Sequence, residues 1–188
     1  MTREEVLQKH KEYLFPCVLN YYAKPLVAER AQAQYVWDSE DRRYLDFFGG
    51  ILTISIGHCH PKVTERIKQQ VDRLQHTSTL YPNQQIVALA EKLAQITPGK
   101  LQKSFFTNSG TEANEAAVLL ARMATGSFEV VALRHGYSGH SLIAKSLTAQ
   151  SPWRRAGVIS LGVVHAMSPY CYRCPLGLSY PDCGVACA

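Results

Sequence analysis

The amino-acid sequence predicts an α/β fold that contains a largely parallel sheet, and three observations support this. From residue 61 onward, stretches with the spacing of amphipathic helices alternate with short runs rich in β-branched and aromatic residues. The composition, 46% hydrophobic and 19% charged over 188 residues, is typical of a globular chain with a substantial core. No apolar run approaches the roughly 20 residues of a membrane span.

The first sixty residues predict one helix and one antiparallel pair of strands. The first dozen residues have amphipathic spacing and lead into an extended arm. Two aromatic-rich runs, residues 35–37 and 44–48, flank the polar residues 38–43, which is typical of a strand, a turn and a second strand. The pair Gly49-Gly50 ends the second strand.

Two helices are predicted next. Pro61 stands at a first-turn position, and apolar residues recur behind it on one helical face, at Val63, Ile67, Val71 and Leu74. A second helix fits residues 83–96, where Pro98-Gly99 ends the pattern. Strands and helices then alternate: a strand at 104–107, a helix at 110–125, a strand at 129–133, a short helix after Ser141 and a strand at 158–164.

The start of the predicted helix 110–125 has the residues of an anion site. Gly110 lets an anion approach the backbone, Ser109 and Thr111 add hydroxyl donors, and the first turn offers unpaired N–H groups. The motifs of nucleoside-triphosphate loops and of dinucleotide turns are absent, so a single monophosphate fits better. The alternative is an ordinary capping box, in which Ser109 and Glu112 satisfy each other's backbone donors without a ligand.

Three motifs, in order, carry a resemblance to a known family. They are Asn108-Ser-Gly-Thr-Glu-Ala-Asn-Glu-Ala-Ala, Tyr44-Leu-Asp-Phe-Phe-Gly-Gly-Ile and Gly57-His-Cys-His-Pro-Lys-Val. The chain resembles the N-terminal part of class III, fold-type I PLP-dependent aminotransferases. With His76-Thr-Ser-Thr it is most similar to their alanine–glyoxylate aminotransferase 2-like branch. The resemblance implies a mostly parallel large-domain sheet, incomplete here, with helices on both faces.

The resemblance also implies the domains and the cofactor. Residues 1–55 would be the N-terminal arm and small-domain segment, and residues 56–188 the start of the large domain, with a Cys-rich loop at 168–188. The cofactor would be pyridoxal 5'-phosphate (PLP), with its phosphate held by the residues of the anion site, Ser109, Gly110 and Thr111. Tyr137 would lie on the face of the pyridine ring, and Ser138, which replaces the usual His, would be the second contact of that loop.

By the same resemblance, the whole enzyme would be a homodimeric transaminase that takes a small-molecule amino donor and a keto acid. Gly50 and Ile51, with Gly49, would border the access to the substrate. Ile51 stands where ornithine-type relatives carry Tyr, and this difference disfavours a preference for ornithine as the substrate. Donor and acceptor identities stay open, and related members include racemase-like and decarboxylating chemistries.

Charge and cysteine usage exclude some partners. Basic residues exceed acidic ones, 20 to 15, but they are scattered, so no nucleic-acid partner is expected. No membrane partner is expected either, and the polar N-terminal segment without an apolar signal core predicts a cytoplasmic protein.

Four of the six cysteines crowd the last eighteen residues, at Cys171, Cys174, Cys183 and Cys187. They leave open a thiolate metal site, although no metal is assigned, and a non-catalytic metal module or dimer partner remains an alternative function.

Two further patterns suggest other sites. Gly136-Tyr-Ser-Gly-His140 after a strand is similar to the nucleophile elbow of serine hydrolases, with Ser138 as nucleophile, but Gly is missing two residues after the Ser. His58 and His60 flank Cys59, yet no fourth metal ligand stands nearby, so a packing role is expected.

The lysine and the acidic residue that PLP chemistry also requires have no recognisable motif in these 188 residues. Lys145 has no motif around it, so the catalytic residues stay unknown. We expect the chain to be an N-terminal fragment that binds the cofactor but does not catalyse the reaction. We also expect its Cys-rich end to reflect a truncation.

Overall fold

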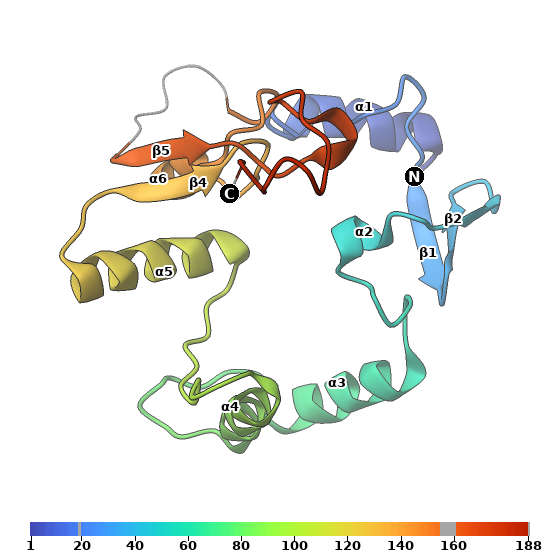
Figure 1. Ribbon diagram of the computed structural model, residues 1–188. Coiled ribbons are helices and arrows are strands. Elements are labelled where there is room, and N and C mark those ends of the chain that lie inside the picture. Colours follow the sequence, from blue (N-terminus) through green and yellow to red (C-terminus); the bar gives the residue numbers. More distant parts are fainter. Residues whose placement is uncertain (19, 155–160, 188) are drawn as a thin grey trace. The chain divides into compact units, whose positions relative to one another are not determined.

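The computed structural model describes residues 1–18, 20–154 and 161–187, which form two compact units, Met1–Gln84 and Gln85–Ala188 (Figure 1). Each unit is described by itself. The predicted domain boundary after residue 55 refers to the complete family fold and stays a prediction. None of the helices in the described ranges is long and apolar enough to cross a membrane.

Unit 1 begins with helix α1 (Arg3–Tyr13), where Thr2 and Glu5 form a reciprocal capping box. A three-stranded antiparallel sheet follows, in the order β1 (Ala28–Gln32), β2 (Tyr35–Asp38), β3 (Arg43–Leu45). The predicted strand, turn and strand are confirmed. Strand β1 was missed because Ala-Glu-Arg-Ala-Gln has neither β-branched nor aromatic residues.

A buried carboxylate organises the turn between β2 and β3. Asp38 is 4% exposed and accepts hydrogen bonds from Arg42 Nε and Tyr44 Oη, each at 2.8 Å. Burial raises the pKa of Asp38, but the bonds from the backbone and side chain of Arg42 and from Tyr44 outweigh it and hold that pKa well below its usual range. The charged Asp38 is therefore a structural group of the hairpin.

The rest of unit 1 is a short helical turn, α2 (Gly49–Leu52), and the helix α3 (Pro61–Arg73). Pro61 lies in the first turn of α3, as predicted. The apolar face predicted for this helix is exposed in the described structure, with Val63, Ile67, Val71 and Leu74 each more than 40% accessible.

Unit 2 contains helix α4 (Gln84–Ile96), helix α5 (Gly110–Thr125), strand β4 (Val130–Leu133), helix α6 (Leu142–Leu147) and strand β5 (Val163–Ala166). β4 and β5 pair in parallel with α6 in the connection between them, and this βαβ arrangement belongs to the predicted parallel sheet (Figure 1). Its small core is formed by Val118 of α5, Ala144 of α6 and Val163 of β5. Gly126, with φ of 69°, ends α5 and donates to the Arg122 carbonyl.

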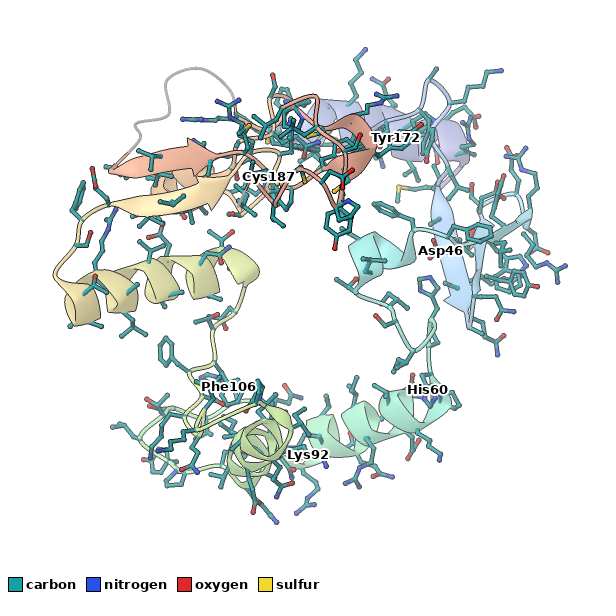
Figure 2. The ribbon with its side chains drawn as sticks, viewed as in Figure 1. Asp46, His60, Lys92, Phe106, Tyr172 and Cys187 are labelled. Carbon is teal, nitrogen blue, oxygen red and sulfur yellow. The ribbon has the colours of Figure 1, made fainter. Side chains whose placement is uncertain are left out.

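Two predicted strands differ from the structure. Residues 104–107 form no strand and pair with no described segment, and Phe106, labelled in Figure 2, is 41% exposed. The strand predicted at 158–164 is found as β5, shifted toward the C-terminus. Its predicted first part, residues 158–160, lies outside the described residues.

Candidate cofactor and substrate site

The N-terminus of α5 keeps backbone donors available. Ser109 is the N-cap, and its Oγ accepts from Glu112 N at 3.2 Å. The Glu112 carboxylate accepts from Asn108 N at 2.6 Å instead of from Ser109 N, so the expected capping box is only half formed. Within the described residues, the N–H groups of Gly110 and Thr111 donate to no protein acceptor. These amides can therefore bind an anion.

Space for an anion is present at the same turn. Ser109 and Gly110 are exposed, and a Cβ added to Gly110 would meet no atom within 4 Å. A pocket of about 610 Å³ adjoins the turn and includes Asn108 and Thr111 in its lining. The sequence-predicted residues of the anion site thus lie together at an open helix start.

The loop between β4 and α6 lies against this turn. His140 N donates to Thr111 Oγ1 at 3.3 Å, and a Cβ on Gly139 would collide with the same hydroxyl. Tyr137 is 51% exposed, and the rings of His140 and Trp153 meet it edge-on at centroid distances of 5.9 Å. Tyr137 therefore lies in the loop that contacts the anion site, and its stacking on a cofactor ring stays a prediction.

Ser138 is held through its backbone and not through its hydroxyl. Its N–H donates to Thr148 Oγ1 at 3.0 Å, and its carbonyl accepts from Asn114 Nδ2 at 2.7 Å. A serine nucleophile needs a histidine within hydrogen-bond reach, and in the described part of the chain no histidine bonds to Ser138 Oγ. The serine hydrolase alternative is therefore not supported, and the cofactor contact of Ser138 stays a prediction.

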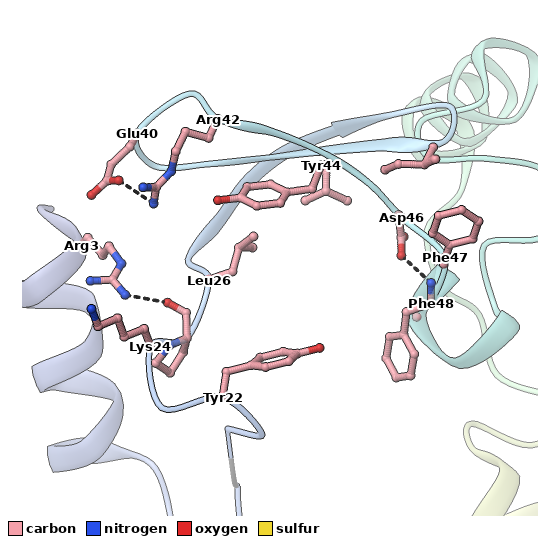
Figure 3. Close-up of a pocket in the computed structure, with 14 residues that line it drawn as sticks. Arg3, Tyr22, Lys24, Leu26, Glu40, Arg42, Tyr44, Asp46, Phe47 and Phe48 are labelled. Atoms are coloured by element: carbon pink, nitrogen blue, oxygen red, sulfur yellow. Dashed lines mark hydrogen bonds and ion pairs between the residues drawn. The ribbon is translucent and has the colours of Figure 1, made fainter.

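The predicted substrate residues of unit 1 lie in a left-handed turn. Gly50 and Ile51 have φ of 58° and 60°, and Ile51 is 73% exposed. Asp46 Oδ1 accepts from Phe48 N at 2.8 Å and from Gly49 N at 2.9 Å, which fixes the start of the turn. A pocket of about 960 Å³ includes Gly50 in its lining, together with Phe47, Phe48, Tyr22 and Tyr44 (Figure 3). Ile51 is not among its lining residues.

Asp46 is a residue that the sequence interpretation did not single out. Its Oδ2 lies 2.7 Å from His58 Nε2, and this hydrogen bond, followed by those from the amides of Gly49 and Phe48, lowers the pKa of Asp46. His58 thus packs against a carboxylate, in agreement with the packing role expected for it. The signal available in the sequence was an Asp three residues before the pair Gly49-Gly50, at which a turn was expected.

The cysteine cluster does not form a ligand set in the described residues. The six cysteines are free thiols, and no group of three or more His, Cys, Asp or Glu side chains in the described ranges could hold a metal ion. Cys171 is exposed and the other three of the cluster are partly exposed. The thiolate metal module therefore has no geometric support in this part of the chain.

The comparison with known families shows to which family this chain belongs. A family profile described as aminotransferase class-III matches residues 19–177. The chain belongs to the class-III aminotransferase family. It is 44% identical over 172 residues to alanine–glyoxylate aminotransferase 2 homolog 2, mitochondrial, of Arabidopsis thaliana, covering 92% of this chain and 36% of that protein. It is 40% identical over 175 residues to alanine–glyoxylate aminotransferase 2, mitochondrial, of Homo sapiens, covering 93% and 34%. The chain thus spans about a third of the length of these relatives, and the predicted resemblance to their branch is confirmed.

Solved structures of this family confirm the fold class. The chain superimposes on taurine:2-oxoglutarate aminotransferase from Bifidobacterium kashiwanohense, solved with PLP and glutamate, with a TM-score of 0.80 and 28% identity, covering 92% of this chain and 39% of that one. An omega-transaminase from Thermomicrobium roseum gives a TM-score of 0.81 with 31% identity, covering 93% and 42%. The chain therefore forms part of the fold-type I transferase architecture, which the sequence predicted.

Proposed function

We propose that this chain provides the PLP-binding part of a transaminase that moves an amino group from an amino acid or amine to a keto acid. The observation that carries the proposal is the pair of unpaired amides of Gly110 and Thr111 at the open start of the 16-residue helix α5. These amides and the positive end of the helix dipole stabilise a phosphate. Membership of the class-III family supports PLP as the source of that phosphate.

The two hydroxyl side chains at the start of α5 can still donate hydrogen bonds to a ligand. The hydroxyls of Ser109 and Thr111 accept from Glu112 N and His140 N, so each O–H remains able to donate to a phosphate oxygen. Tyr137, which is 51% exposed, would hold the plane of the cofactor ring by stacking on it. When bound, PLP supplies an electron sink for negative charge that develops on the substrate carbon next to the amino group.

A second reaction class is supported by one relative. The leucine/methionine racemase of Thermococcus litoralis is 35% identical over 189 residues, covering 100% of this chain and 42% of that protein. A racemase that uses PLP would need the same phosphate and ring contacts, so the residues described above would serve either reaction. Assaying the protein at its natural length with an amino acid in the presence and absence of a keto acid separates them, because only transamination requires the acceptor.

We also propose that the protein acts as a homodimer. The exposed apolar face of α3, which consists of Val63, Ile67, Val71 and Leu74, supports an apolar interface. Light scattering of the protein at its natural length gives its mass in solution, and a monomeric mass at micromolar concentration contradicts this assembly.

A titration with PLP tests the proposed phosphate site. The Gly110→Asp variant places a carboxylate where the phosphate would lie, and an acidic residue in the first turn also favours the helix itself. We expect PLP affinity, followed by absorbance and equilibrium dialysis, to fall by roughly 100-fold while thermal stability stays the same or rises. This combination separates a lost binding site from a damaged fold.

The matched control is Gln84→Asp, which adds the same charge at the first residue of α4, another exposed helix start. It should leave PLP affinity within about twofold, since the added carboxylate does not stand at the Gly110 and Thr111 amides and salt screens exposed charges. Equal losses in both variants, or no PLP binding by the unaltered protein, would contradict the proposed function.

A further inference from the structure

The structure records three side-chain hydrogen bonds from one face of α5 to the segment 138–143. Thr111 Oγ1 accepts from His140 N at 3.3 Å, Asn114 Nδ2 donates to the Ser138 carbonyl at 2.7 Å, and Glu115 Oε1 accepts from Ile143 N at 3.2 Å. The partners are 29, 24 and 28 residues apart in sequence. Segment 138–143 follows Tyr137 directly and leads into α6.

Helical spacing places these three side chains on a single face. Positions 111, 114 and 115 are related as i, i+3 and i+4, and such residues are neighbours on a helix surface. All three are partly buried, whereas the residues between them are exposed. This face therefore meets the loop, while the amides of Gly110 and Thr111 remain open at the end of the same helix.

A fourth contact holds the loop from its other side. Thr148 is fully buried, and its hydroxyl donates to the Ala144 carbonyl at 2.8 Å while it accepts from Ser138 N. Both polar backbone groups of Ser138 are thus satisfied by side chains, Asn114 on one side and Thr148 on the other. Within the described residues, Ser138 is thus held by a side chain of α5 and by the C-cap of α6, while the carbonyl of Gly136, before Tyr137, accepts from Ala149 N at 3.0 Å.

We infer that Asn114 and Glu115 are positioning residues, which fix the Tyr137 loop relative to the phosphate-binding amides of α5. This inference rests on the proposed function. It adds that one rigid helix sets the distance between the phosphate contact and the ring contact. A cofactor that uses both contacts gains affinity only where their spacing is held, because binding then needs no ordering of the loop.

The first test separates ring positioning from phosphate binding. Asn114→Leu keeps the side-chain volume and removes the donor to Ser138. We expect PLP to bind about tenfold more weakly and its induced circular dichroism, which reports how rigidly the ring is held, to fall at saturation. The affinity for inorganic phosphate should change less than twofold. Asn20→Leu, at an exposed position without a recorded bond, is the matched control and should change neither.

The second test requires no cofactor. Glu115→Leu removes the acceptor of Ile143 N, whereas Glu115→Gln keeps a carbonyl oxygen in its place. In the cofactor-free protein, we expect the exchange of the Ile143 amide proton to become about tenfold faster in Glu115→Leu and to return near the original rate in Glu115→Gln. Glu91→Leu, on the exposed surface of α4, controls for the lost charge.

The outcomes separate the inference from the proposed function. Failure of the unaltered protein to bind PLP overturns the proposed function. The exchange rates would still show whether Glu115 holds the segment 138–143. Unchanged exchange in Glu115→Leu, or PLP binding by Asn114→Leu with unaltered affinity and dichroism, overturns the inference. Equal weakening of inorganic phosphate and PLP by Asn114→Leu also overturns it, because the side chain would then support the helix start and not the ring loop.

Discussion

Two glycine-containing turns were predicted to contact a ligand, and they are held in different ways. The turn 46–52 of unit 1 is fixed mainly by its own Asp46, which accepts from the amides two and three residues later. The loop 136–141 of unit 2 is fixed by side chains 24 to 29 residues away on α5 and by the buried Thr148. The first is a local structure, and the second depends on tertiary contacts.

This difference predicts how far the loss of one contact disturbs neighbouring residues in each unit. Loss of one contact in the local turn should stay confined to the amides around Asp46 and to His58. Loss of one contact in the loop 136–141 should disturb the Tyr137 ring and the segment 138–143, since side chains far away in the sequence hold this loop. Substitutions in the two turns therefore test whether the first is held locally and the second by tertiary contacts.

The largest effect is expected for Gly139→Ala in the loop. A Cβ there would collide with Thr111 Oγ1 and lie 3.1 Å from Ala144 Cβ, and φ is 125°, a conformation that favours glycine. We expect a loss of about 3 kcal/mol in the free energy of unfolding, measured by urea denaturation, together with weaker PLP binding. Gly110→Ala, where a Cβ meets nothing within 4 Å, should cost little stability. Equal stability of the two variants would show that Gly139 is not closely packed.

A smaller effect is expected for Thr148→Val, which keeps the shape of the side chain. It leaves Ser138 N without its acceptor in a buried place, and this should cost about 1–2 kcal/mol of unfolding free energy. The control is Thr125→Val, because the Thr125 hydroxyl also bonds a helix carbonyl but is exposed to water. A loss in Thr125→Val as large as in Thr148→Val would mean that burial of the loop contact is unimportant.

The local elements were predictable from sequence, and the tertiary ones were not. Helix 110–125 was predicted within its observed bounds because Ser109 and Gly126 are strong local end signals. Strand 104–107 was wrong because a strand requires a partner edge, which its own residues cannot specify. The positions of Ser109, Gly110 and Thr111 at an open helix start also followed from local chemistry.

The roles of Asn114 and Glu115 could not be found in the same way. Both stand inside the motif that indicated a phosphate site, and nothing in their spacing reveals that they bond to a loop 24 and 28 residues further along the chain. The Cys-rich end is the opposite case. Its four thiols are conspicuous in the sequence, yet they are not gathered into a metal site in the described residues.

The smallest effect is expected for Asp46→Asn in the local turn. Because the bonds from His58, Gly49 and Phe48 lower the pKa of Asp46 when folded, the carboxylate stabilises unit 1 above its ordinary pKa of 3.8. That stabilisation is lost as the pH falls through the lowered value. The stability difference between the unaltered protein and Asp46→Asn should therefore shrink on acidification from about pH 5 to pH 2.

Thermal melts at several pH values measure this difference, and Asp72→Asn on α3 serves as the control for a lost exposed carboxylate. The amides of Phe48 and Gly49 should exchange faster in Asp46→Asn, while those of Ser138 and Ile143 should be unaffected. A pH-independent difference would contradict the assigned cause of the lowered pKa. Faster exchange at Ser138 would contradict the local character of the turn.

The most direct measurement of the central claim is a titration of the ¹⁵N-labelled protein with PLP, followed by amide NMR. If the first turn of α5 holds the cofactor phosphate, the Gly110 and Thr111 resonances should show the largest downfield shifts, and inorganic phosphate should reproduce them in part. Saturation with PLP that leaves these two resonances in place, while others move, would contradict the account.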